Sequence, residues 1–430
     1  MKIKTISYNN FKIATIEKAS PLVVILLSVD CHTENSAKRQ AAQALYGDLL
    51  LAGAGKYSRE EFTYAVNILG ADFSVQFDNG VMTIKVTTLA KHLSKTLGLL
   101  EVVLTAPRFE EVEISRAKDL LLNRLQVAKE EAPLLANVNL RQTLYGAADR
   151  HYGYLPAEIE REVKAVGVDE LRALHQVVLT GFWHASIGGQ LDGLKAVVGK
   201  LEKLKKAQLS PDTVVEKKVS VTKIEKNDLI ATLVPSRQNV ELAIGAPVPI
   251  TFTHEDLAPL VFGMNVLAKW GGFAGRLMST VREQEGLTYM IYGRLEGISV
   301  TEAGFWQIRT FFAPKDAEKG LTSTLREINK IIDKGITPKE LEFFRVTLKT
   351  GEILAQDSLS SFVRSVHSAL VNGLNYEEYQ AFRERLYTCS KKEVDAALKK
   401  YLDPKRLVVG IAGPTKEVEK PLRAVLVAGK

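Results

Sequence analysis

The chain has 430 residues, of which 46% are hydrophobic and 25% are charged. This length favours two or more domains, and the composition excludes a disordered protein. The 57 basic and 50 acidic residues give a net charge of +7, which is spread along the chain. Because the densest basic stretches, 200–206 and 216–226, are interleaved with acidic or apolar residues, we expect no nucleic-acid partner.

The number of cysteines and the length of the apolar segments bear on the cellular compartment in which the chain is expected. Cys31 and Cys389 are too few for a disulfide framework or a thiolate metal site, and a single bridge between them remains open. The first residues lack the apolar core of a signal peptide, and the longest apolar run, 21–29, is far shorter than the roughly 20 residues that span a bilayer. We expect a soluble protein without a membrane span, cytoplasmic if Met1 is the true start and periplasmic if a leader was removed.

Strands and helices are both expected in the first half. Ser58-Arg59-Glu60-Glu61 is a capping box that opens a helix, and Asn79-Gly80 is a strong signal for a hairpin turn. In chain order we expect two strands within 11–29, helices over 36–53 and 58–70, strands 73–77 and 81–87, helices 92–104, 111–129, 134–145 and 168–179, a strand 184–189 and a helix 191–204.

The second half repeats this pattern after a polar segment without periodicity, 205–219, which we interpret as a linker. The clearest parallel sets strand 81–86 and its two helices against strand 305–310 and helices 315–334 and 338–351. Thr337 is the expected N-cap of the last helix, with Pro338 at its first position and Glu340 at its third. The remaining expected elements are strands 229–234 and 240–246 and a helix 255–269. We therefore predict two tandem α+β domains, 1–204 and 220–430, each a mostly antiparallel β-sheet with helices on one face.

One stretch of the second half, Trp270 to Gly293, carries candidate chemistry. Gly271 and Gly272 permit a sharp turn, and the spacing of Phe273, Leu277 and Val281 predicts a helix that ends near Gly286. Residues 287–292 then alternate as in a strand, which predicts Arg282 and Tyr289 on either side of a helix-to-strand turn. These two side chains could donate hydrogen bonds to a peptide carbonyl or to the oxyanion that forms from it. Alternatively, they are a surface arginine and a half-buried sheet tyrosine.

Three segments together resemble the pitrilysin or insulinase family of zinc metallopeptidases, in the two-domain branch of the processing peptidases. The segment 49–57 resembles the end of the family's first helix. His151-Tyr152-Gly153-Tyr154-Leu155-Pro156 is similar to its His-Pro-Tyr-Gly loop, and 271–289 is similar to its glycine-rich, Arg and Tyr segment. The resemblance covers nearly the whole chain.

Active members carry H-x-x-E-H on that first helix, where two imidazoles hold zinc and the glutamate takes a proton from the metal-bound water. In this chain Ala44 and Asp48 stand at the histidine positions and Gly47 at the glutamate position. Near the expected third ligand, 122–125 contains no carboxylate. The resemblance therefore implies no metal and no cofactor in this chain.

Other catalytic sites are not apparent. The seven histidines show no pair at metal-ligand spacing, and the one cluster, His32 with Cys31 and Glu34, is a candidate metal site or a polar loop. Neither a nucleophile elbow nor a phosphate-binding loop occurs; Gly410-Ile411-Ala412-Gly413 lacks the lysine that would follow.

The resemblance implies a non-catalytic subunit of a heterodimeric zinc metallopeptidase. Its partner would be a homologous H-x-x-E-H subunit that holds the zinc, and the substrate would be an extended peptide. Arg282 and Tyr289 would act in trans at the partner's zinc site, with Gly271, Gly272 and Phe273 as substrate-binding candidates, and this chain would enclose half of the peptide-binding chamber. No peptidase activity is expected of the chain alone, which could also form a homodimer. The alternative is a purely structural or assembly subunit of the core-protein type.

Overall fold

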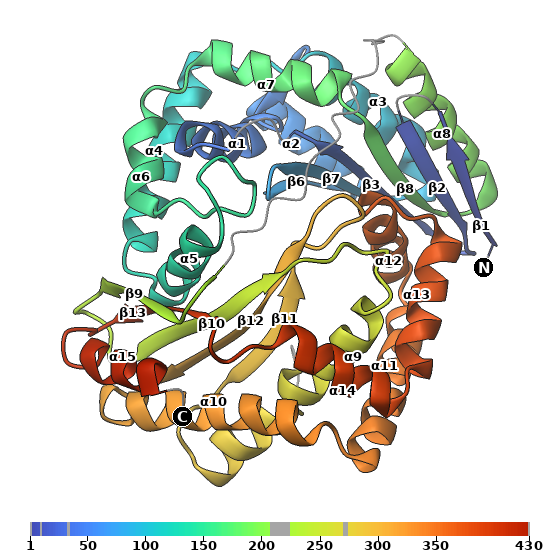
Figure 1. Cartoon of the computed structure of the whole chain (residues 1–430). Helices are drawn as coiled ribbons and strands as arrows, with labels where there is room; N and C mark the ends of the chain where they lie inside the picture. The colour runs from blue at the N-terminus through green and yellow to red at the C-terminus, as the bar shows by residue number, and fades with distance from the viewer. Residues whose placement is uncertain (1, 9–10, 32–34, 207–223, 270–273, 429–430) are drawn as a thin grey trace. The chain divides into compact units, whose positions relative to one another are not determined.

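The computed structural model describes residues 2–8, 11–31, 35–206, 224–269 and 274–428. The chain forms two compact units (Figure 1). Unit 1 comprises residues 1–125, 157–215 and 352–379, and unit 2 comprises residues 126–156, 216–351 and 380–430. Each unit thus takes in a segment that is embedded in the other half of the chain.

Unit 1 is built on a six-stranded sheet with the order β1-β2-β8-β3-β7-β6. Only β2 and β8 pair in parallel. Along β7, half-buried and buried residues alternate, as expected for a strand whose two faces differ in packing. The strands are β1 (Lys2–Ser7), β2 (Phe11–Glu17), β3 (Leu22–Asp30), β6 (Asp72–Asp78), β7 (Val81–Leu89) and β8 (Trp183–Gly189); β4 (Gly53–Ala54) and β5 (Tyr57–Ser58) form a separate two-stranded sheet.

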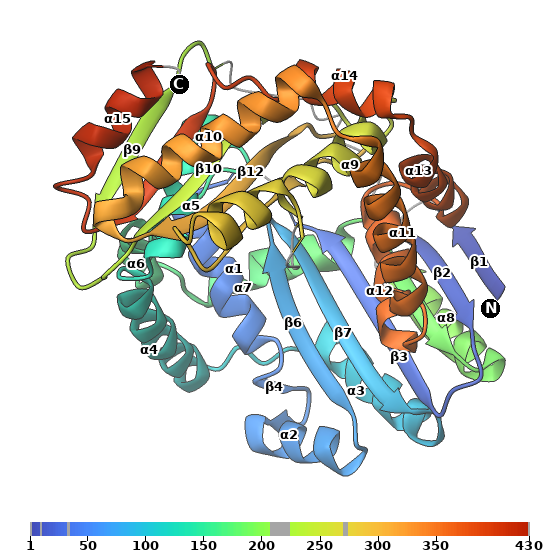
Figure 2. The same cartoon turned by 90° about the horizontal axis from the view of Figure 1, so that it is seen from below.

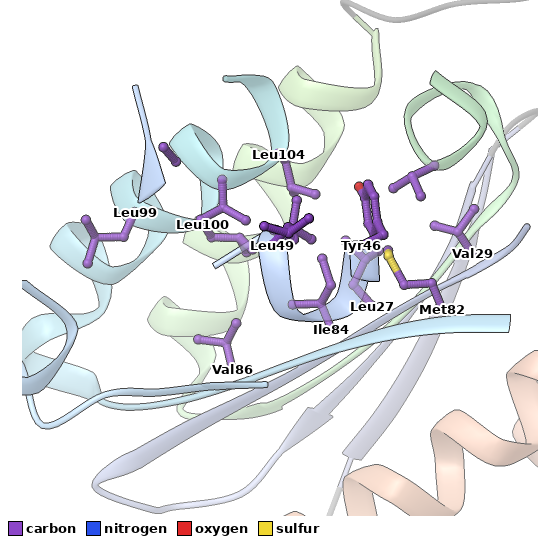
Figure 3. Close-up of a cluster of buried hydrophobic side chains, with 14 of the residues drawn as sticks. Leu27, Val29, Tyr46, Leu49, Met82, Ile84, Val86, Leu99, Leu100 and Leu104 are labelled. Carbon is purple, nitrogen blue, oxygen red and sulfur yellow. The ribbon is translucent and has the colours of Figure 1, made fainter. Parts of the chain in front are cut away.

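Helices of the first half pack on one face of this sheet. Figure 3 shows part of the resulting core, in which Tyr46 and Leu49 of α1 lie among side chains of β3, β7 and α3. Burying an apolar side chain such as Leu49 stabilises the unit by about 1.5–3 kcal/mol. The helices are α1 (Ala37–Leu49), α2 (Arg59–Ile68), η1 (Ala90–His92), α3 (Leu93–Thr105), α4 (Glu111–Ala128), α6 (Pro156–Val163), α7 (Val168–Thr180) and α8 (Leu191–Lys206).

Unit 2 contains a five-stranded sheet with the order β11-β12-β10-β13-β9, in which only β13 and β9 are parallel. Its strands are β9 (Asp228–Leu233), β10 (Val240–Val248), β11 (Ile291–Glu296), β12 (Gly304–Phe312) and β13 (Val408–Gly413). A second apolar core joins the sheet to α9 (Leu257–Ala268), η2 (Met278–Gln284), α10 (Ala317–Lys334), α14 (Lys391–Tyr401) and α15 (Glu419–Ala428). The remaining helices are η3 (Pro314–Asp316), α11 (Pro338–Ala355) and α13 (Tyr376–Thr388).

The two sheets have the same topology. The order β2-β8-β3-β7-β6 matches β9-β13-β10-β12-β11, and the parallel pair occupies the same place in each. Ile84 and Ile308, the residues paired by the sequence repeat, lie in the corresponding strands β7 and β12. The predicted duplication and the α+β class are confirmed.

One helix is exchanged in each direction between the halves of the chain. α12 (Leu359–Val371) packs on the second face of the unit 1 sheet, over β8, β3 and β2 (Figure 2). α5 (Ala132–Leu144) packs on the sheet of unit 2, over β13, β10 and β9. Both approaches need a glycine: a Cβ at Gly188 would lie 2.3 Å from Cγ2 of Val363, and one at Gly410 would lie 2.1 Å from the carbonyl oxygen of Ala136.

The local signals at turns and helix ends form as predicted. Ser58 caps α2 with a reciprocal capping box, and Asn79 and Gly80 adopt positive φ values of 46° and 81° between β6 and β7. Thr337 and Glu340 make the same reciprocal bonds at the start of α11, which runs on past Gly351. In the described part of the chain, no helix is long and apolar enough to cross a bilayer.

Candidate functional site

α1 has a buried face and an open face. Leu45, Tyr46 and Leu49 are buried, whereas Ala44, Gly47 and Asp48 are all half-exposed. The spacing of these three residues, i, i+3 and i+4, places them on one side of the helix. The open side of α1 therefore coincides with the positions that the zinc motif would occupy.

Asp48 is engaged by a residue distant in the sequence. Its carboxylate accepts a hydrogen bond from Nη2 of Arg124 on α4. The two side chains retain 39% and 57% of their exposure, so this ion pair contributes only about 0–1 kcal/mol to stability. Arg124 lies in the segment 122–125, where the family's third metal ligand is expected, and it brings a positive charge to that position.

These residues do not fit a zinc ion. Ala44 and Gly47 offer no donor atom, Asp48 is held by a guanidinium, and Arg124 would repel a cation. Within the described ranges there is no group of three or more His, Cys, Asp or Glu side chains that could hold a metal. His32 and Glu34 lie outside the described residues, whereas Cys31 and Cys389 are both buried free thiols.

The buried side chains of His175 and Cys31, next to Tyr46 of α1, are not suited to catalysis. Oη of Tyr46 lies 2.7 Å from Nδ1 of His175 in a hydrogen bond. Burial lowers the pKa of His175 to about 4 and raises the pKa of the Cys31 thiol to about 12. Neither side chain is in a state suited to nucleophilic or acid–base chemistry near neutral pH.

In unit 2, Arg282 and Tyr289 are brought together. Arg282 belongs to η2, a π-helical turn, and such turns are frequent at functional sites. Its Cζ lies 5.0 Å from the centroid of the Tyr289 ring, within cation–π range, and its Nη1 donates to Oε1 of Glu283 at 2.6 Å. Tyr289 is 62% exposed, and among the described residues its hydroxyl has no hydrogen-bond partner.

The backbone around Tyr289 is held by its neighbours. Thr288 is buried, and its Oγ1 accepts from the Met290 N–H at 3.3 Å and from Oγ1 of Thr310 on β12 at 3.3 Å. This turn projects Tyr289 outward. β11 begins only at Ile291, so the predicted strand over 287–292 is wrong for its first four residues, because the Thr288 side chain takes the place of a ladder partner.

Arg276 anchors the start of the same segment. It donates to both carboxylate oxygens of Glu340 at 2.6 and 2.8 Å and to the carbonyl oxygen of Gly335 at 2.7 Å. Sequence reasoning missed this residue, since its partners are about sixty positions away and carry no pattern. The substrate-binding candidates Gly271, Gly272 and Phe273 lie outside the described residues.

The loop 151–156 is structural in unit 2. His151 is buried, bonds Asp149 through Nδ1 at 3.0 Å, and packs its ring 4.9 Å from that of Tyr145. A Cβ at Gly297 would lie 2.5 Å from Nε2 of His151, so this glycine allows the loop to pack closely. His151 therefore has no role at an exposed site.

Two family models match the chain. The insulinase model, peptidase family M16, matches residues 33–152, and the model of the peptidase M16 inactive domain matches residues 190–345. Among curated proteins, the chain is similar to the "non-peptidase homolog YmxG" of Helicobacter pylori, with 22% identity over 393 residues that cover 89% of this chain and 87% of that protein.

Solved structures show the same fold. A peptidase M16 inactive domain from Pseudomonas fluorescens has a TM-score of 0.84 at 19% identity, and a protease from Helicobacter pylori has a TM-score of 0.82 at 12% identity. A conserved protein from Enterococcus faecalis has a TM-score of 0.73 at 16% identity. Each comparison covers 96% of this chain, and 99%, 99% and 98% of the other chain respectively. With its zinc motif replaced by Ala44, Gly47 and Asp48, the chain belongs to the M16 family of peptidases as an inactive member.

Proposed function

We propose that this chain is the non-catalytic subunit of a heterodimeric zinc peptidase. It supplies Arg282 and Tyr289 in trans to a homologous partner that carries H-x-x-E-H, and it encloses half of the chamber that holds an extended peptide. The observation that carries the proposal is the pairing of Arg282 with an outward-facing Tyr289, in a chain whose own metal position has no ligand set.

The chemistry of the pair suits this role. The Arg282 guanidinium keeps its charge at any working pH, and a phenol hydroxyl can donate a hydrogen bond without losing its proton. Donors positioned beside the oxyanion that forms during peptide hydrolysis lower the barrier by a few kcal/mol, which is roughly a hundredfold in rate per donor. The turn at Thr288 and the anchor at Arg276 hold the segment before substrate arrives, as such catalysis requires.

Mixing purified chains tests the proposal. Neither this chain nor a zinc-bearing homologue should cleave an unfolded peptide efficiently alone, and the pair should. Arg282→Ala and Tyr289→Phe should each lower kcat roughly a hundredfold at unchanged zinc content of the partner. Arg423→Ala, on the exposed side of α15, is the control for loss of a surface arginine.

The outcomes of these experiments distinguish a catalytic role of Arg282 and Tyr289 from a purely structural or assembly role of the chain. Full activity of the Arg282→Ala, Tyr289→Phe double variant would show that the pair has no catalytic role. If the chain instead forms a stable complex that contains no zinc-bearing homologue, the structural or assembly role is correct.

A further inference from the structure

Glu285 ends the π-helical turn that carries Arg282. The backbone N–H groups of residues 285, 286 and 287 donate to the carbonyl oxygens of residues 280, 282 and 281, at 3.0 Å each. Gly286 has a φ of 63°, a conformation that costs glycine little. Because these bonds close the turn on itself, a side chain that ties it to the rest of unit 2 also fixes the backbone of Arg282.

The Glu285 carboxylate ties this turn to α10. Its Oε2 accepts a hydrogen bond from Oγ of Ser323 at 2.5 Å, and its Oε1 accepts one from Nη2 of Arg326 at 2.5 Å. Ser323 is buried, and the side chain of Glu285 is 21% exposed, so the contact is largely sheltered from water. Hydrogen bonds to an ionised group are roughly twice as strong as neutral ones, so Glu285 is a firm attachment.

The partners of Glu285 keep its carboxylate charged. Burial alone would raise the pKa of Glu285, but the hydrogen bonds from Ser323 and Arg326 outweigh burial and place the pKa below its usual value. Arg326 also donates through Nε to Oε1 of the buried Glu327 at 3.3 Å. Two carboxylates therefore orient the Arg326 guanidinium, which fixes the place where Glu285 meets it.

The two ends of the segment that carries Arg282 and Tyr289 are attached to different elements. The Tyr289 end is fixed to β12 by the hydrogen bond between Thr288 and Thr310, and the Arg282 end is fixed to α10 by Glu285. The distance of 5.0 Å between Cζ of Arg282 and the Tyr289 ring centroid spans these two ends. Since cation–π contacts extend to about 6 Å, a shift of about 1 Å at the Arg282 end would disrupt the contact.

We infer that Glu285 is a positioning residue, which holds Arg282 against Tyr289 before a substrate arrives. Ser323 and Arg326 of α10 supply its anchor. Glu285 itself makes and breaks no covalent bond. The inference rests on the proposed function of Arg282 and Tyr289, and it names the side chain that keeps these two donors preorganised.

Fluorine NMR of the isolated chain tests the position of the two donors without a partner. The chain is labelled with fluorotyrosine, and the loss of one signal in Tyr289→Phe identifies Tyr289. Arg282→Ala gives the position of this signal without the guanidinium. Glu285→Ala should move the signal at least halfway toward that position. Glu318→Gln, which changes an exposed carboxylate on the same helix α10, should leave it in place.

Steady-state kinetics of the chain mixed with its zinc-bearing partner test the consequence for catalysis. Glu285→Ala should lower kcat about tenfold and change KM less than twofold, because the donors are displaced and not removed. Arg326→Ala should lower kcat about threefold, since Ser323 still holds one carboxylate oxygen. Glu285→Gln should recover part of the loss, because its amide oxygen can still accept one of the two hydrogen bonds.

The inference is overturned if Glu285→Ala leaves the Tyr289 signal in place, or if it lowers activity only by raising KM. Melting temperatures show whether each variant is folded, and if Glu285→Ala is not, Glu285→Gln and Arg326→Ala carry the same two measurements. Full activity of Arg282→Ala would instead overturn the proposed function. The Tyr289 signal, measured without a partner, then still decides whether Glu285 positions the two side chains.

Discussion

Arg276 ties the start of the segment that carries Arg282 and Tyr289 to the end of α10 and the start of α11 in unit 2. Its side chain is 12% exposed and makes three hydrogen bonds, two of them to the Glu340 carboxylate. We expect Arg276→Ala to lower the free energy of unfolding by about 2 kcal/mol, because a bidentate charged contact is lost and Glu340 keeps only its bonds to Thr337. Denaturant titration measures this difference.

A matched variant separates charge from geometry at the same position. Arg276→Lys keeps the charge but cannot reproduce the fork, so it should recover less than half of the loss. Equal stability of the alanine and lysine variants would show that the anchor depends on packing alone.

Residue-level features were predictable only where they act locally. The absence of zinc ligands at Ala44, Gly47 and Asp48 could be stated from residue identity. The pairing of Asp48 with Arg124 could not, because the two residues are 76 positions apart and only the packing of α1 against its neighbours brings them together. The exposure of the Tyr289 side chain could not be predicted from the sequence either, since it depends on the hydrogen bonds of Thr288 to Met290 and Thr310.

Two glycines at helices should respond to alanine in opposite ways. Gly47 lies inside α1, where a Cβ meets only atoms at 3.8 and 4.0 Å, so Gly47→Ala should raise the free energy of unfolding by about 0.5–1 kcal/mol. Gly335 ends α10 with a φ of 68°, and a Cβ there would lie 2.4 Å from both carboxylate oxygens of Asp395. Gly335→Ala should therefore destabilise by more than 1 kcal/mol.

Thermal or denaturant unfolding of both variants checks this contrast. Asp395 cannot simply move aside, because its Oδ1 accepts a hydrogen bond from the Ile336 N–H at 2.8 Å. If Gly335→Ala proves neutral, the left-handed cap is not required to end α10.

Elements with strong local signals were predicted well and those without were not. The Asn79-Gly80 hairpin and the caps at Ser58 and Thr337 follow from side-chain chemistry within four residues. The strand expected from residue 287 was wrong in its first part because alternation cannot distinguish a strand from a turn held by a threonine. β1, β13 and the helices from α12 onward were not predicted.

At the scale of the whole molecule, buried histidines should make stability fall in acid. Burial lowers the pKa of His175 to about 4, that of His184 to about 4 and that of His367 to about 3, and His184 contributes further to the shift of His367. His367 lies in a buried network, with Nε2 2.7 Å from Oγ of Ser28 and Nδ1 3.1 Å from Oγ of Ser186.

The direction of this pH dependence follows from proton binding. An unfolded histidine, with a pKa near 6.5, binds a proton as the pH falls below that value, whereas the folded side chains stay neutral until about pH 4 or lower. Unfolding therefore takes up protons, and each histidine removes up to about 1.4 kcal/mol of stability per pH unit between roughly pH 6 and 4. Denaturant titrations at several pH values should show this slope.

His367→Gln should reduce the slope of the free energy of unfolding against pH by the amount that one proton contributes. The glutamine amide can still bond Ser28 or Ser186, but it does not titrate in this range. His254→Gln, in a more exposed loop position, is the control for replacing a histidine as such. An unchanged slope in His367→Gln would show that this histidine is protonated in the folded protein.

The architecture was predictable to the level of two duplicated α+β domains, because the repeat of strand and helix patterns is visible in the sequence. The exchange of α5 and α12 between the halves was not, since an amphipathic helix does not reveal which sheet it will cover. Gly188 and Gly410, which allow the close helix approaches, mark the contacts in the sequence.

This exchange has a consequence for synthesis on the ribosome. Val24 and Leu26 of β3 are covered by Val363 and Val366 of α12, which are translated more than three hundred residues later. Until then the nascent unit 1 exposes one apolar face of its sheet. Its folding can finish only after α12 has been translated, near the end of the chain, and until then the exposed apolar face favours aggregation or chaperone binding.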